Sequence, residues 1–127
     1  MKKVISITLL FTTIGFSSPA YQGDIQFQQQ DGSSFEGNLK GDEWFSWVED
    51  KSKHIIKYNN QSKDYEYATI TEVNGSFELL PSGTAVVTTN ELNNSLVEIP
   101  SVNLNTLSSI WQRKRTEALY IGKKRDE

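Results

Sequence analysis

The 127-residue sequence contains no cysteine and a single histidine, His54. Without cysteine the chain has no disulfide framework, and one histidine cannot supply the His-Glu-x-x-His set of a zinc-dependent hydrolase. The sequence also has no Gly-x-Ser-x-Gly elbow and no Gly-rich phosphate-binding loop. We therefore predict a non-catalytic protein without a cofactor or bound metal, and we expect His54 at the surface or at a strand end.

Long hydrophobic runs are also scarce, and the one that exists lies at residues 4–16. Lys2 and Lys3 precede it, and small residues follow at the two positions that a signal peptidase reads, Ser18 and Ala20. The run is shorter than the roughly 18–20 residues that span a bilayer. We predict that residues 1–20 are a secretory signal peptide, that the mature chain is secreted or periplasmic, and that no transmembrane segment remains after cleavage.

Basic residues are few in the body of the chain. Residues 21–110 carry five lysines against thirteen acidic residues, whereas residues 111–127 carry six basic residues against three acidic ones. The acidic body excludes nucleic acid as a partner, because binding to phosphates requires a basic face. The basic tail is predicted to lie on the acidic body, to bind an acidic partner, or to form a solvated helix face.

Turn-forming residues divide residues 21–89 into β-hairpins. Asp31-Gly32 and Asn74-Gly75 are typical of two-residue turns, and polar breaks follow Glu49 and Tyr58. Aromatic and β-branched residues fill the segments between these breaks, as is typical of strands. We expect strands near 25–30, 35–39, 43–49, 54–58, 64–72 and 76–80, and a further β segment at 84–89.

The apolar spacing changes to three and four residues in the last quarter of the chain. This spacing predicts a helix over 105–121, with Asn103 or Asn105 as its N-cap and Gly122 as its stop. Residues 90–103 are interpreted as an extended connector, and residues 104–127 as a basic helix and tail.

The predicted fold is α+β and mainly β. It is a small antiparallel meander of hairpins over residues 21–89, joined by the connector to one C-terminal helix. Curling of the meander toward a barrel remains open at this point.

Three aromatic residues, Trp44, Phe45 and Trp47, fall within four positions, between acidic pairs at 42–43 and 49–50. Strand side chains alternate, so Phe45 and Trp47 share one face and Trp44 lies on the other. The simplest interpretation is a buried core, and the alternative is that one of them, Trp44 first, anchors a partner. The acidic pairs are predicted to cap the two ends of a strand, not to form a glycosidase site.

This stretch also carries a family resemblance. It rests on Asp31-Gly32, Gly41-Asp42-Glu43-Trp44-Phe45-x-Trp47, Glu49-Asp50 and Tyr65-Glu66-Tyr67-Ala68. Over about residues 24–80 the chain resembles the region that follows the signal peptide in secreted zinc metalloproteases of the immune-inhibitor-A type, peptidase family M-six. The chain departs from the family at residues 51–54, where the family has Asp-Gly-Tyr.

In that family the segment precedes the catalytic domain and resembles a propeptide. The resemblance implies a non-catalytic domain that binds a secreted zinc metalloprotease, for latency, folding or inhibition, or a remnant of a split protease gene. It further implies that the domain covers the active-site cleft, with Asp42 or Glu43 as a carboxylate for the metal. The alternative is a secreted β-module that recognises glycans or a surface protein. The candidate partner-binding residues are Asp42, Glu43, Trp44, Phe45 and Trp47.

Overall fold

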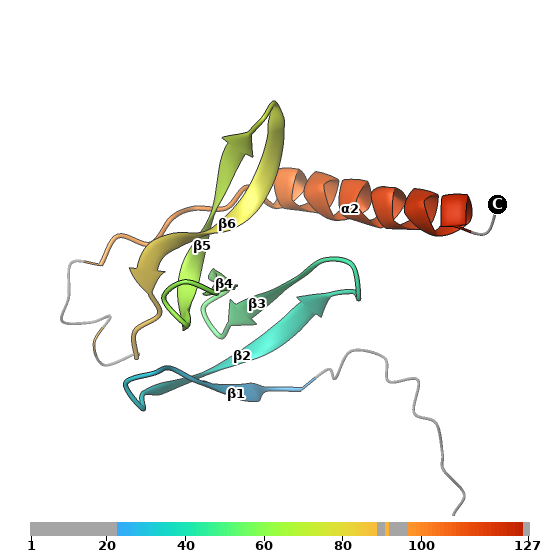
Figure 1. Ribbon diagram of the computed structural model, residues 1–127. Helices are drawn as coiled ribbons and strands as arrows, with labels where there is room; N and C mark the ends of the chain where they lie inside the picture. The colour runs from blue at the N-terminus through green and yellow to red at the C-terminus, as the bar shows by residue number, and fades with distance from the viewer. Residues whose placement is uncertain (1–22, 89–90, 92–96, 126–127) are drawn as a thin grey trace, which may run out of the picture.

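A computed structural model describes residues 23–88, 91 and 97–125, and the predicted signal peptide lies outside the described residues. Six strands form one antiparallel sheet in which each strand pairs with the next along the chain, and one long helix follows (Figure 1). The predicted mainly-β meander with a C-terminal helix is confirmed, and the sheet is not closed. The elements are β1 (Ile25–Gln28), β2 (Ser34–Gly41), β3 (Ser46–Asp50), β4 (Ile55–Asn59), β5 (Asp64–Val73), β6 (Ser76–Ala85) and α2 (Leu104–Arg125).

The two Gly-containing turns differ from each other. Asn74-Gly75 is the predicted two-residue turn, because Val73 pairs with Ser76 and both central residues have positive φ, 51° and 80°. At Asp31-Gly32 the predicted loop length of two residues is wrong, because the loop has three residues. The Gln29 N–H donates to the Ser33 carbonyl at 2.8 Å, which leaves a loop of residues 30–32 with φ 89° at Gly32. A type I turn followed by a left-handed glycine has this form.

Three predicted boundaries are also corrected. The strand expected at 43–49 begins only at Ser46, so Trp44 and Phe45 lie in the loop before it. β6 is one strand that continues through Pro81, whose missing N–H breaks no pairing because β6 is an edge strand. Helix α2 continues through Gly122, the predicted stop, and its last turn is basic, which complements the helix dipole. Its N-cap is Asn103, whose Oδ1 accepts the N–H groups of residues 105 and 106 at 3.0 and 3.1 Å.

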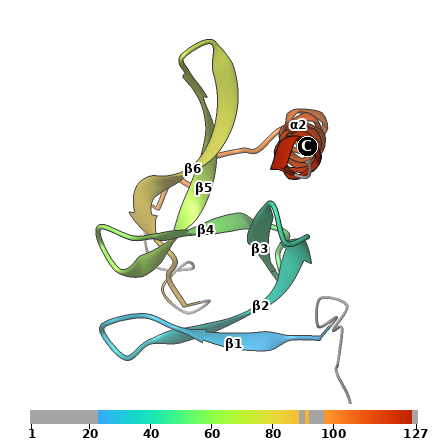
Figure 2. The same cartoon turned by 45° about the vertical axis from the view of Figure 1, so that its right-hand side comes forward.

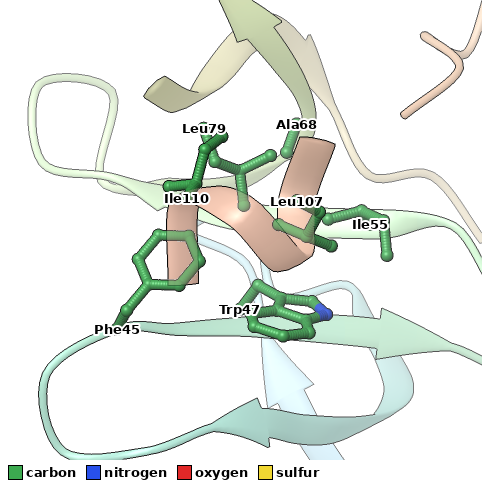
Figure 3. Close-up of a cluster of buried hydrophobic side chains, with 7 residues drawn as sticks. All are labelled: Phe45, Trp47, Ile55, Ala68, Leu79, Leu107 and Ile110. Carbon is green, nitrogen blue, oxygen red and sulfur yellow. The ribbon is translucent and has the colours of Figure 1, made fainter. Parts of the chain in front are cut away.

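Both faces of the sheet are buried over its centre. Phe45 and Trp47 pack on one face against Leu107 and Ile110 of α2, as Figure 3 shows, together with Leu79 of β6. The opposite face carries a second cluster of Val48, Ile56, Tyr67 and Val86. The predicted alternation along β3 is confirmed, because the neighbouring residues Trp47 and Val48 enter different clusters.

The second cluster is enclosed because the sheet curls. The strand directions change strongly between β1 and β6 (Figure 2), which brings Phe27 of β1 within 5.1 Å of the Tyr65 ring of β5. The buried Gln29 side chain fixes this approach. Its Nε2 donates to the Tyr65 carbonyl at 2.8 Å and its Oε1 accepts the Tyr65 N–H at 2.8 Å, as a paired strand residue would do. Its Nε2 also lies 3.3 Å from the Val86 carbonyl.

A buried carboxylate lies at the irregular pairing of β5 with β6. Glu66 is 3% exposed and accepts hydrogen bonds from Asn59 Nδ2 at 3.0 and 3.1 Å, from Ser62 Oγ at 2.8 Å and from the Gly83 N–H at 2.8 Å. Burial opposes its ionisation, but these donors outweigh that effect and hold the pKa of Glu66 below its usual 4.5. The charged form therefore ties the β4–β5 loop to β6.

We expect Gln29→Ala to lower the free energy of unfolding by about 1–3 kcal/mol, because it leaves the half-buried Tyr65 N–H without its acceptor and removes one of the two donors to the Tyr65 carbonyl, the other being the Val86 N–H. Urea unfolding measures the change. The control is Gln28→Ala, one residue away on an exposed side chain, which should stay within about 0.5 kcal/mol. Equal losses in the two variants would contradict the role of Gln29 in closing the curl.

We expect Glu66→Gln to lower the free energy of unfolding by about 1–3 kcal/mol near neutral pH, because an amide donor replaces an acceptor of charge-assisted bonds. A depressed folded-state pKa stabilises the fold above the unfolded value and loses that effect as the pH falls. The difference between wild type and variant should therefore shrink below a pH of about 4.5. A difference that is independent of pH in urea unfolding would refute an ionised Glu66.

Candidate functional site

The loop of residues 42–45, called the Trp44 loop below, joins β2 to β3. Asp42 closes it: its N–H donates to the Phe45 carbonyl at 2.9 Å, and its Oδ1 accepts the N–H groups of Trp44 and Phe45 at 3.0 and 3.1 Å. Gly41 precedes the loop with φ 96°, and a Cβ there would lie 2.1 Å from the Phe45 oxygen. The sequence Gly-Asp before the aromatics thus specifies this conformation.

A second contact of Asp42 joins the loop to the helix. Trp111 Nε1 of α2 donates to Asp42 Oδ2 at 2.7 Å, and the Trp111 ring packs edge-on against Trp47 at 5.6 Å. Desolvation opposes ionisation of Asp42, but the bonds from Trp111 and from the loop N–H groups outweigh it and lower the pKa of this carboxyl below 3.8. Both carboxylate oxygens of Asp42 are therefore engaged within the fold.

The tip of the loop faces solvent. Trp44 is 39% exposed, and the Arg115 guanidinium of α2 lies 6.0 Å from its ring centre. Glu43 is exposed, and its side chain forms no hydrogen bond or ion pair with any residue that the structure describes. A shallow hollow of about 140 Å³ lies along the adjoining helix, and it is lined by Ser108, Trp111, Gln112 and Arg115.

The structure divides the five candidate residues into two groups. Phe45 and Trp47 are buried under α2, where they form the core cluster of Figure 3. Asp42 fixes the loop, and Glu43 and Trp44 form its exposed tip. Residues of α2 complete the surface, namely Trp111 and Arg115, and the local sequence pattern gave no indication that they lie beside this loop.

The first basic residues of α2 pair with the sheet. Arg113 Nη2 lies 2.9 Å from Glu78 Oε1 and 2.8 Å from the Phe77 carbonyl, and Lys114 Nζ lies 3.1 Å from Glu78. The prediction that the basic tail lies on the acidic body holds for these two residues. The end of the helix extends past the sheet (Figure 1), and its exposed side chains include those of Leu119, Tyr120 and Ile121.

His54 and Asp50 have a structural role in the turn between β3 and β4. His54 Nδ1 lies 2.8 Å from Asp50 Oδ2, and Asp50 Oδ1 accepts the N–H groups of Ser52 and His54, so Asp50 caps the β3–β4 turn as predicted.

Within residues 23–88, 91 and 97–125, no three acidic, histidine or cysteine side chains gather as a metal site would require. None of the helices described there is both long and apolar enough to cross a membrane.

Comparisons with known proteins returned no match to a family model, to a curated protein or to a solved structure. The function is therefore inferred from the Trp44 loop, its helix and the surfaces around them.

We expect Trp111→Phe to lower the urea midpoint near neutral pH, since the ring is kept while the donor to Asp42 is lost. Because the pKa of Asp42 is lowered in the fold, this stabilisation is present above about 3.8 and disappears as the pH falls, so the variant should lose less stability on acidification. Trp44→Phe, which changes an exposed indole, is the control. Additive effects of Trp111→Phe and Asp42→Asn in a double-mutant cycle would show that the bond is not energetically coupled.

Proposed function

We propose that this chain is a non-catalytic domain that binds a protein partner through the tip of the Trp44 loop. The observation that carries the proposal is that the loop residues differ in their roles. Asp42 fixes the shape of the loop, while the side chains of Glu43 and Trp44 are exposed to a partner. A loop held in one conformation loses little entropy on binding. Tryptophan is among the residues that most often dominate the binding energy of an interface.

The family resemblance of this segment suggests the kind of partner, the catalytic domain of a secreted zinc metalloprotease. In this proposal the Trp44 loop enters the active-site cleft, where the Glu43 carboxylate binds the zinc of the partner and Trp44 fills an adjacent apolar pocket. Asp42 is the poorer ligand of the two acids, because its oxygens already accept three hydrogen bonds. Binding of this kind would keep a protease latent or inhibit it in the secreted or periplasmic space.

We expect the mature fragment 21–127 to slow peptide cleavage by a purified catalytic domain of this protease family. Glu43→Gln and Trp44→Ala should each raise the inhibition constant about 30-fold or more, as expected for interface residues worth about 2 kcal/mol. The control is Glu72→Gln, which removes the same charge from an exposed side chain on the β5–β6 hairpin.

The cleavage rate as a function of added fragment measures these constants, and circular dichroism verifies that each variant is folded. An unchanged rate with the wild-type fragment would reject the protease as the partner. Equal weakening by Glu43→Gln and Glu72→Gln would show that general charge, and not the loop tip, is responsible.

A further inference from the structure

A row of four aromatic rings crosses the sheet face that lies away from α2. Tyr58 of β4 meets Tyr65 of β5 edge-on at 5.1 Å, and Tyr65 in turn contacts Phe27 at 5.1 Å and Phe35 at 5.6 Å. Phe27 and Phe35 are stacked at 5.3 Å with an interplanar angle of 18°. The inner three rings support the second core cluster, whereas Tyr58 at the end of the row is 43% exposed.

A groove of about 270 Å³ opens beside the exposed end of this row. Its walls are aromatic and aliphatic side chains with a few neutral polar groups among them. The lining residues are Phe27, Leu39, Ser46, Trp47, Val48, Ile56, Lys57, Tyr58, Asn60 and Tyr65.

The groove offers a ligand no free charge, although the protein as a whole is acidic. Lys57 is its one charged lining residue. The Lys57 ammonium donates to the Ser46 carbonyl at 2.7 Å and lies 5.0 Å from the centre of the Phe45 ring. Phe45 belongs to the cluster that α2 covers. No carboxylate lines the groove. A cationic ligand would find no carboxylate there, and an anionic ligand would have to compete with the Ser46 carbonyl for the Lys57 ammonium, which favours a neutral ligand.

Neutral polar side chains at the groove retain their hydrogen-bonding capacity. The Tyr58 hydroxyl, the Asn60 amide and the Ser46 hydroxyl donate to and accept from no residue in the described part of the chain. Together they offer several donors and acceptors beside an exposed aromatic ring. Such a site matches a ligand with one flat apolar side and a rim of hydroxyl groups.

We propose that this groove binds a neutral oligosaccharide, with one sugar ring stacked on Tyr58 and its hydroxyls bonded to Asn60 and Ser46. An extended peptide fits less well, because a peptide that adds to a sheet needs a free strand edge. The pairing of β3 with β4 ends at Val48 and Ile56, and only Ser46 and Trp47 of β3 lie beyond it. The Ser46 carbonyl already accepts from Lys57, so this short gap beside the groove offers no continuous edge to a peptide. The groove shares no residue with the Trp44 loop. A test of saccharide binding is therefore independent of the test of the protease proposal.

The test is isothermal titration of fragment 21–127 with cellohexaose, xylohexaose, chitohexaose and maltohexaose, followed by amide chemical-shift mapping for any saccharide that binds. We expect at least one of them to bind with a dissociation constant of about 1 mM or lower, which corresponds to about 4 kcal/mol. The shifted amides should cluster around Tyr58 and Asn60. Tyr58→Ala should weaken binding at least 10-fold, and Tyr58→Phe, which keeps the ring, should weaken it less.

The matched control is Phe77→Ala, which removes an aromatic ring of similar exposure, 52%, from the distant β5–β6 hairpin and should leave saccharide binding unchanged. Both alanine variants lose an exposed side chain, so both are expected to fold. Absence of binding by all four saccharides would overturn the proposal. Equal weakening by Tyr58→Ala and Phe77→Ala, or shifts that map to the Trp44 loop, would overturn the assigned site.

Discussion

The fold depends on the need to bury both faces of a small sheet. In β3, β4 and β5, neighbouring residues are buried in pairs: Trp47 with Val48, Ile55 with Ile56, and Tyr67 with Ala68. Neighbours in a strand point to opposite faces, so a flat sheet would leave one member of each pair in water. The chain covers one face with α2 and encloses the other by curling β1 and β2 toward β5.

A polar side chain helps to hold α2 on one face of the sheet, and another helps to hold the β1–β2 hairpin over the other face. Each of these contacts also shapes one of the exposed surfaces. Asp42 ties α2 to the Trp44 loop through Trp111, which leaves Glu43 and Trp44 at a rigid tip. Gln29 ties the β1–β2 hairpin to Tyr65, which lines up the aromatic rings that end at the Tyr58 groove. The proposed binding surfaces are thus consequences of how the core is closed.

The opposite charges of body and tail serve the same closure. Glu78 holds both Arg113 and Lys114, and Arg113 also bonds the Phe77 carbonyl on the edge strand β6. Pro81 offers no N–H on that strand. An edge that is covered in this way is protected against pairing with another strand. Contacts with a partner are therefore not expected through β6, whereas β1 is the other edge of the sheet.

The sequence alone predicted the order of the elements and the alternation of buried residues along β3, but it placed residues 43–45 in a strand where the structure has a loop. Period-two alternation and turn dipeptides predicted six strands in order, and three- and four-residue spacing predicted the helix, because these signals are local. It also identified Asp42 to Trp47 as unusual, although it could not separate the buried Phe45 and Trp47 from the exposed Trp44 with certainty. Only the tertiary structure decided the contacts of Asp42 with Trp111, 69 residues away, and of Gln29 with Tyr65, 36 residues away. Such pairings depend on the path of the whole chain, and no local pattern records them.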